Sequence, residues 1–114
     1  MLYRFKSRAA ADLIMLEADG RRILTLMTGA SEPRGILVWT RMADALQRLD
    51  EAVRVEEEAR QILLQRCQQG QASDEEMARA ERERDAVRLG QRVQPMVQML
   101  KRCMAEEADL VWGV

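Results

Sequence analysis

The chain has 114 residues, of which 47% are hydrophobic and 32% are charged, so its length and composition fit one globular domain and not a disordered segment. Its net charge of −1 creates no global field that would favour nucleic acid or a membrane surface. The absence of histidine excludes Ser-His-Asp and Cys-His catalysis, histidine-ligated metals and histidine-based pH switching.

The first predicted element is a β-strand over residues 2–8, where side chains alternate between two faces. Arg4, Lys6 and Arg8 fall on one of these faces. One interpretation is an anion contact, such as the phosphate backbone of a nucleic acid. The other, which we favour, is a solvated edge strand whose charges prevent sheet-to-sheet aggregation.

Next comes a predicted β-hairpin with strands at about 12–17 and 21–27, because Asp19-Gly20 is a strong signal for a tight turn. Neither strand alternates apolar and polar residues, as a half-exposed strand would. Both faces of this sheet therefore need a covering layer. A chain this short does not readily supply two layers, so the pattern predicts self-association.

Residues 28–35 are rich in Gly, Ser and Pro and predict a loop, followed by a fourth strand at 36–39. The apolar residues 110–114 predict a fifth strand that rejoins the sheet. Trp39 and Trp112 at strand ends are typical of core covers, and otherwise of an interface or, less readily, of a ligand pocket. The residues that we expect at an interface between copies are Leu13, Met15, Ile23, Thr25, Trp39 and Trp112.

At Thr40 the apolar period changes from that of a strand to that of a helix. Thr40 is the expected N-cap of a helix that runs to about Gln68 and ends at Gly70. Ser73 and Glu76 have the spacing of a capping box, which predicts a second helix. We expect Gly90 and Pro95 to break or kink this helix. The first helix is too long for the sheet, so residues of about 54–88 should form a charged antiparallel helical arm.

Few groups of residues in the chain have the spacing expected of a catalytic, redox or metal-binding site. The acidic triplets 56–58 and 74–76 lie on helices, where consecutive side chains diverge and do not converge on one ion. Cys67 and Cys103 are expected to be structural thiols in preference to a redox pair. We expect no catalytic residue, no cofactor and no metal. With no signal-like segment and no stretch long enough to span a membrane, we expect a cytoplasmic protein.

The two ends of the chain resemble a family of small proteobacterial proteins, domain-of-unknown-function family 1840. The resemblance spans the whole chain and implies a bacterial cytoplasmic protein, but no site residue. The segments that carry it are Met1-Leu2-Tyr3, Phe5-Lys6-Ser7, Asp12 to Leu16, Arg34-Gly35-Ile36, Met99 to Arg102 and Val111 to Val114.

The sequence thus predicts a single α+β domain, with an antiparallel sheet of four or five strands packed by two long helices. The expected function is that of a small interaction module without catalytic activity, which forms a homodimer and has an unidentified protein partner. Weak nucleic-acid binding through Arg4, Lys6 and Arg8 is the first alternative, and a small enzyme of unknown class is the second.

Overall fold

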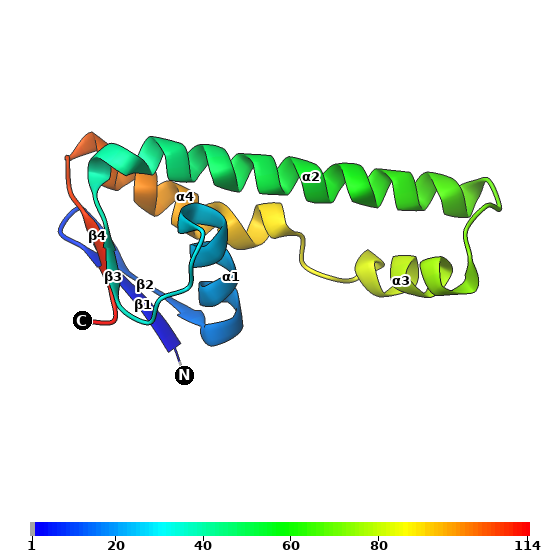
Figure 1. Ribbon diagram of the computed structural model, residues 1–114, viewed down its shortest axis with the longest axis horizontal. Helices are drawn as coiled ribbons and strands as arrows, with labels where there is room; N and C mark the ends of the chain where they lie inside the picture. Colours follow the sequence, from blue (N-terminus) through cyan, green and yellow to red (C-terminus); the bar gives the residue numbers. More distant parts are fainter. Residues whose placement is uncertain (1) are drawn as a thin grey trace.

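The protein consists of a small sheet at one end of a long helix, with further helices packed along that helix (Figure 1). The structure is a computed structural model, and it describes residues 2–114. It confirms the predicted α+β class and the return of the C-terminal strand to the sheet. The elements in chain order are β1 (Leu2–Ser7), β2 (Ala10–Leu16), α1 (Glu17–Thr28), β3 (Gly35–Leu37), the 3-10 turn η1 (Trp39–Arg41), α2 (Met42–Gln68), α3 (Asp74–Arg84), α4 (Leu89–Ala105) and β4 (Leu110–Trp112).

The sheet has the strand order β2-β1-β4-β3, and each neighbouring pair is antiparallel. The C-terminal strand β4 lies between β1 and β3, so the two ends of the chain are neighbours in the sheet. Phe5 of β1 is opposite Leu13 of β2 on one side and Trp112 of β4 on the other. The register fixes two faces, because successive side chains in a strand point to opposite sides.

The predicted hairpin is wrong from residue 17 onward, where the chain forms the helix α1 in place of a tight turn and a third strand. Gly20, Ile23, Leu24 and Met27 are buried in α1, and their spacing follows the 3.6-residue period of a helix. Asp19-Gly20 lies in the first turns of this helix. Gly20 is needed there for close packing, because a Cβ atom at this position would overlap the ring of Tyr3.

The hydrophobic core lies between one face of the sheet and the helices α1, α2 and α4. Phe5 and Trp112 meet in it with ring centroids 6.0 Å apart. Leu100 of α4 is fully buried in the same cluster. A Cβ atom at Gly35 would overlap the indole of Trp112, so a larger residue at this position would displace the indole.

Helix α2 extends far past the sheet, as the sequence predicted, and α3 packs antiparallel to its distal half (Figure 1). We call residues 54–88 the arm and the rest of the described chain the head. The arm gives the molecule extents of 52 × 28 × 21 Å. The capping box at Ser73 is confirmed, and Gly70 has the positive φ of 69° expected where α2 ends. Thr40 is not an N-cap: η1 precedes α2, and no side chain caps α2.

The second predicted helix is interrupted earlier in the chain than expected, at residues 85–88, so that it forms two helices, α3 and α4. Gly90 and Pro95 both lie inside the continuous helix α4. The side chain of Pro95 is exposed, so its ring faces solvent and costs the helix one hydrogen bond. A side chain of α2 binds the first residue of α4: the backbone N–H of Leu89 donates to Oε2 of Glu56 at 2.9 Å.

Candidate functional site

One face of the sheet is left uncovered by the residues that the structure describes. The helices pack against the face that carries Phe5 and Trp112, while the opposite face carries the alternate side chains. We call this second surface the open face. Its large apolar side chains are exposed, with Leu16 at 66% and Ile36 at 58% relative accessibility. The exposed apolar residues of the open face and its ends are Leu2, Ile14, Leu16, Ile36, Val38 and Val114.

The open face also carries positive charge between its apolar ends. Arg4 lies beside Ile14 in the sheet, and its guanidinium is 3.7 Å from the carboxylate of Asp12. Lys6 lies opposite Val111 and is half-buried. At the rim of this surface is a hollow of about 220 Å³ that Leu2, Pro33 and Val114 help to line. The face thus combines exposed aliphatic side chains with two cations, of which Arg4 is paired with Asp12.

The residues predicted for an interface lie mostly on the covered side. Ile23 and Trp112 are 2% and 4% exposed and belong to the core, and Leu13 and Met15 are half-buried against the helices. Trp39 is half-buried in η1, where its backbone N–H donates to Oδ1 of Asp109 at 2.9 Å.

Of the predicted interface residues, just Thr25 is exposed. Its hydroxyl donates to the carbonyl of Arg21 within α1. The exposed apolar residues Ile14, Leu16 and Leu2 were missed, although the sequence carries their signal. They occupy the positions between the core residues in β1 and β2, and this alternation identifies the outward face.

The three predicted anion contacts are not brought together. Arg4 and Lys6 share the open face, but Arg8 follows β1 in the turn that leads to β2. The guanidinium of Arg8 donates to the carbonyl oxygens of Glu106 and Glu107, at 2.8 and 3.3 Å, where α4 ends. Arg8 therefore stabilises the C-terminus of a helix, a position that favours a cation. Arg4, which is paired with Asp12, and Lys6 remain as the cations of this surface.

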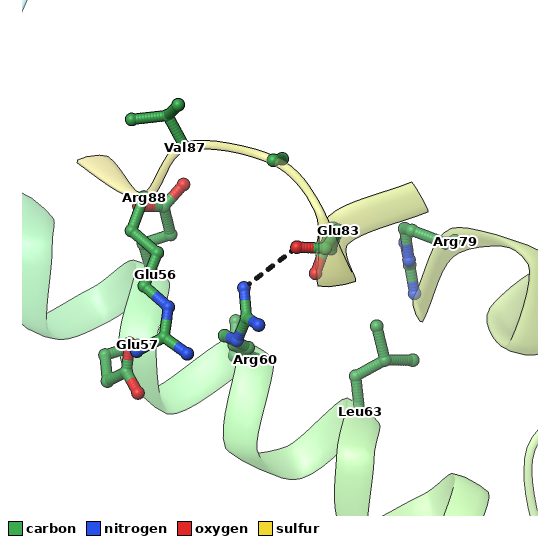
Figure 2. Close-up of a pocket in the computed structure, with 10 residues that line it drawn as sticks. Glu56, Glu57, Arg60, Leu63, Arg79, Glu83, Val87 and Arg88 are labelled. Carbon is green, nitrogen blue, oxygen red and sulfur yellow. Dashed lines mark hydrogen bonds between the residues drawn. The ribbon is translucent and has the colours of Figure 1, made fainter. Parts of the chain in front are cut away.

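A cavity of about 250 Å³ lies in the arm between α2 and α3 (Figure 2). Arg60 reaches across it and donates to the carbonyl of Glu83 at 3.1 Å. Its lining combines apolar side chains such as Leu63 with three arginines and three glutamates, whose formal charges cancel. The formal charge of the lining is therefore zero. The lining residues are Glu56, Glu57, Ala59, Arg60, Leu63, Arg79, Glu83, Ala86, Val87 and Arg88.

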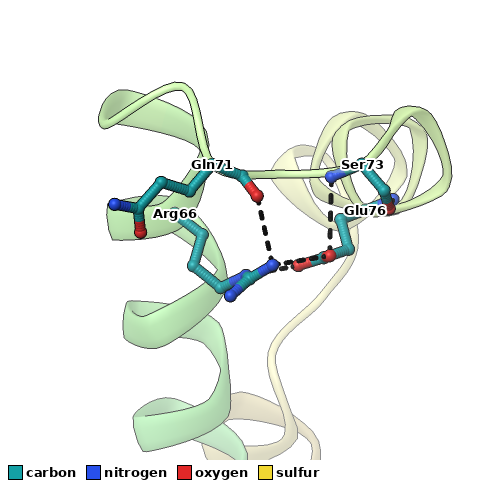
Figure 3. A network of polar contacts seen from close by, with 4 residues as sticks. All are labelled: Arg66, Gln71, Ser73 and Glu76. Atoms are coloured by element: carbon teal, nitrogen blue, oxygen red, sulfur yellow. Dashed lines mark hydrogen bonds and ion pairs between the residues drawn. The ribbon is translucent and has the colours of Figure 1, made fainter.

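The tip of the arm is held by a polar network (Figure 3). Arg66 of α2 makes two hydrogen bonds to the carboxylate of Glu76, at 2.7 and 3.0 Å, and a third to the carbonyl of Gln71. Glu76 also accepts from the backbone of Ser73 in the capping box. The hydrogen bonds from Arg66 hold the pKa of the Glu76 carboxyl below its ordinary value, and those to Glu76 raise the pKa of Arg66. This network has a structural role, because both charged groups are used within the arm.

The two cysteines lie in different regions. Cys103 is buried in the head, where its thiol is 3.2 Å from the hydroxyl of Ser7, and Cys67 is half-buried near the end of α2. Both are free thiols. Among residues 2–114, no three Cys, Asp or Glu side chains are grouped so as to hold a metal ion. None of the helices described is both long and apolar enough to cross a membrane.

Comparison with known proteins adds one finding. The family model described as Domain of unknown function (DUF1840) matches residues 1–112 of the 114-residue chain. No curated protein and no solved structure matches the chain.

Proposed function

The chain belongs to the family described as Domain of unknown function (DUF1840), and we propose that it is a small self-associating interaction module without catalytic activity. One observation carries this proposal: the helices cover a single face of the sheet in the part of the chain that the structure describes. The remaining surface exposes aliphatic side chains that a second protein chain can cover.

The energetic argument rests on the size of these side chains. Removing one large aliphatic side chain fully from water contributes about 1.5–3 kcal/mol. Leu2, Ile14 and Leu16 form one exposed group, because Leu2 lies opposite Leu16 and Ile14 is the next outward residue of β2. A contiguous exposed apolar patch is more typical of an interaction site than of a free surface.

The first partner in this proposal is a second copy, which makes the protein a homodimer in the cytoplasm. A stable dimer interface buries at least about 1,000 Å² in total. A homodimer leaves part of the sheet accessible, so a further protein partner can bind to the assembly. Nucleic-acid binding is less well supported, because Arg8 is used at the end of α4 and Arg4 is paired with Asp12.

Light scattering coupled to size exclusion, over a dilution series, tests self-association directly. The expected result is a mass of twice 13.1 kDa at micromolar concentration, with dissociation on dilution. A mass of 13.1 kDa over the whole micromolar range would refute the proposal. Repeating the series in high salt gives a control, since a contact driven by apolar burial weakens little when charges are screened.

A further inference from the structure

We propose that two copies join edge to edge through β2, so that two four-stranded sheets become one antiparallel sheet of eight strands. This inference rests on the proposed self-association and places the contact between copies at the edge of the sheet, which leaves most of the open face for the further protein partner. The starting point is the strand order, in which β2 is one end of the sheet and β3 is the other. In residues 2–114 no strand pairs with the outer edge of β2.

The two edges of the sheet differ in length and protection. β3 has three residues and follows the loop that contains Pro33, so it offers little backbone for pairing. β2 has seven residues and no Lys, Arg or Pro. Its one charged residue, Asp12, is paired with Arg4. Proteins normally protect an exposed edge with lysine, proline, a bulge or a very short strand, and most of β2 has none of these features.

The register of β2 supports the same conclusion. The pairing with β1 is irregular between Phe5 and Ser7, close to the start of β2. From Leu13 to Leu16 the pairing is regular. The regular part carries a continuous apolar sequence, with Ile14 and Leu16 exposed on the open face and Met15 half-buried on the other face. An added strand would meet both the backbone groups and these side chains.

Symmetry favours a second copy as the added strand. A two-fold axis perpendicular to the sheet pairs β2 with itself in the antiparallel direction, so one strand supplies both sides of the contact. With the axis at Leu13, the centre of β2, Asp12 lies opposite the second copy's Ile14, and no like charges are directly opposed. Beside this edge a hollow of about 220 Å³, lined by Leu13, Pro95 and Arg102 among others, leaves room for side chains of the incoming strand.

The test compares two glutamate substitutions on the same face of the sheet. Ile14→Glu places a carboxylate on β2, directly opposite the second copy's Asp12 in the proposed register, and Ile36→Glu places the same charge on β3, where the side chain has similar exposure, 58% against 49%. We expect Ile14→Glu to raise the dimer dissociation constant at least about tenfold, because like charges would be directly opposed at two symmetry-related positions, and Ile36→Glu to leave it unchanged. Light scattering measures both, and circular dichroism confirms that each variant is folded.

Each remaining outcome has a defined meaning. If both variants dissociate, the contact is the open face, which overturns the edge contact and keeps the proposed self-association. If both remain dimeric, the contact lies elsewhere and the edge contact is again overturned. A native protein that is monomeric overturns the proposed function and this inference together.

Hydrogen exchange on the native protein gives an answer that does not depend on the folding of a variant. The β2 amides that point away from β1 should become more protected as concentration rises through the dissociation constant, while the β3 amides should not change. Equal protection of β2 at all concentrations of a sample that does dimerise would overturn the edge contact.

Discussion

The head and the arm are built from the same helix, α2, but different forces hold them. In the head, α2 buries Met42, Ala45 and Leu49 against α1, α4 and the core. Among residues 54–88, just Leu63 is buried, and none of the residues of α3 is. The arm depends instead on exposed ion pairs and a capping box. Exposed polar contacts contribute little each, so the arm should open locally while the head stays folded.

The largest expected difference comes from removing equivalent apolar side chains from the two regions. Leu100→Ala leaves a cavity in a fully buried site and should lower the free energy of unfolding by about 2–5 kcal/mol. Ile62→Ala in the arm, where the side chain is exposed, should change it by less than about 0.5 kcal/mol. Urea denaturation of both variants measures the contrast. Equal effects would show that the arm is as tightly coupled to folding as the core.

Two helical glycines in the head give the next comparison. Gly20→Ala should lower the free energy of unfolding by about 1–3 kcal/mol, because the new methyl group overlaps the ring of Tyr3. Gly90→Ala is its matched control, since the nearest atom to its new methyl group is Cγ1 of Val53 at 3.4 Å. There the better helix propensity of alanine should stabilise the protein by up to about 1 kcal/mol. Thermal unfolding should shift the two midpoints in opposite directions.

A smaller effect is expected at the start of α3. Ser73→Ala removes the side chain that accepts from the backbone N–H of Glu76, which should cost the helix about 1 kcal/mol. Hydrogen exchange of the α3 amides should accelerate about fivefold, while exchange in β1 should not change. Ser73→Thr keeps the acceptor and serves as control. Acceleration in both elements would mean that the arm and head open together.

The smallest effect concerns pH. Because the pKa of Glu76 is lowered in the folded arm, its contribution to stability is fully present above the ordinary glutamate pKa and is lost as pH falls through the lowered value. Exchange of the α3 amides, corrected for the intrinsic pH dependence of exchange, should therefore accelerate below about pH 4. In Glu76→Gln this acid-dependent step should be absent. A step of equal size in both proteins would assign it to other carboxylates.

The sequence predicted structure best in long segments with a regular apolar pattern. It predicted structure worst where the interpretation depended on a single dipeptide. The long helix to Gln68, the capping box at Ser73 and the C-terminal strand were predicted correctly. Asp19-Gly20 has the composition of a tight turn, yet the apolar spacing from Gly20 to Met27 is helical. In this segment tertiary packing favours the helix over the tight turn, because Gly20 allows α1 to approach Tyr3 of β1.

The sequence predicted that an apolar surface of the sheet needs a covering layer, but it did not predict which residues form that surface. The apolar run around Leu13 to Leu16 indicated correctly that its strand carries apolar residues on both faces. Which face is covered depends on where the helices lie, and this comes from contacts between distant parts of the chain. Arg8 shows the same limit, because its partners, the carbonyl groups of Glu106 and Glu107, are almost a whole chain length away in sequence.

The elongated shape has a consequence for how the protein behaves in solution. The radius of gyration is 16.6 Å, whereas a compact domain of this length has a value of about 13 Å. The protein should therefore diffuse more slowly than its mass suggests and elute early from a sizing column calibrated with compact standards. An elution volume alone would overestimate the mass of a monomer. A scattered-light mass or a sedimentation equilibrium, which do not depend on shape, should therefore decide the number of copies.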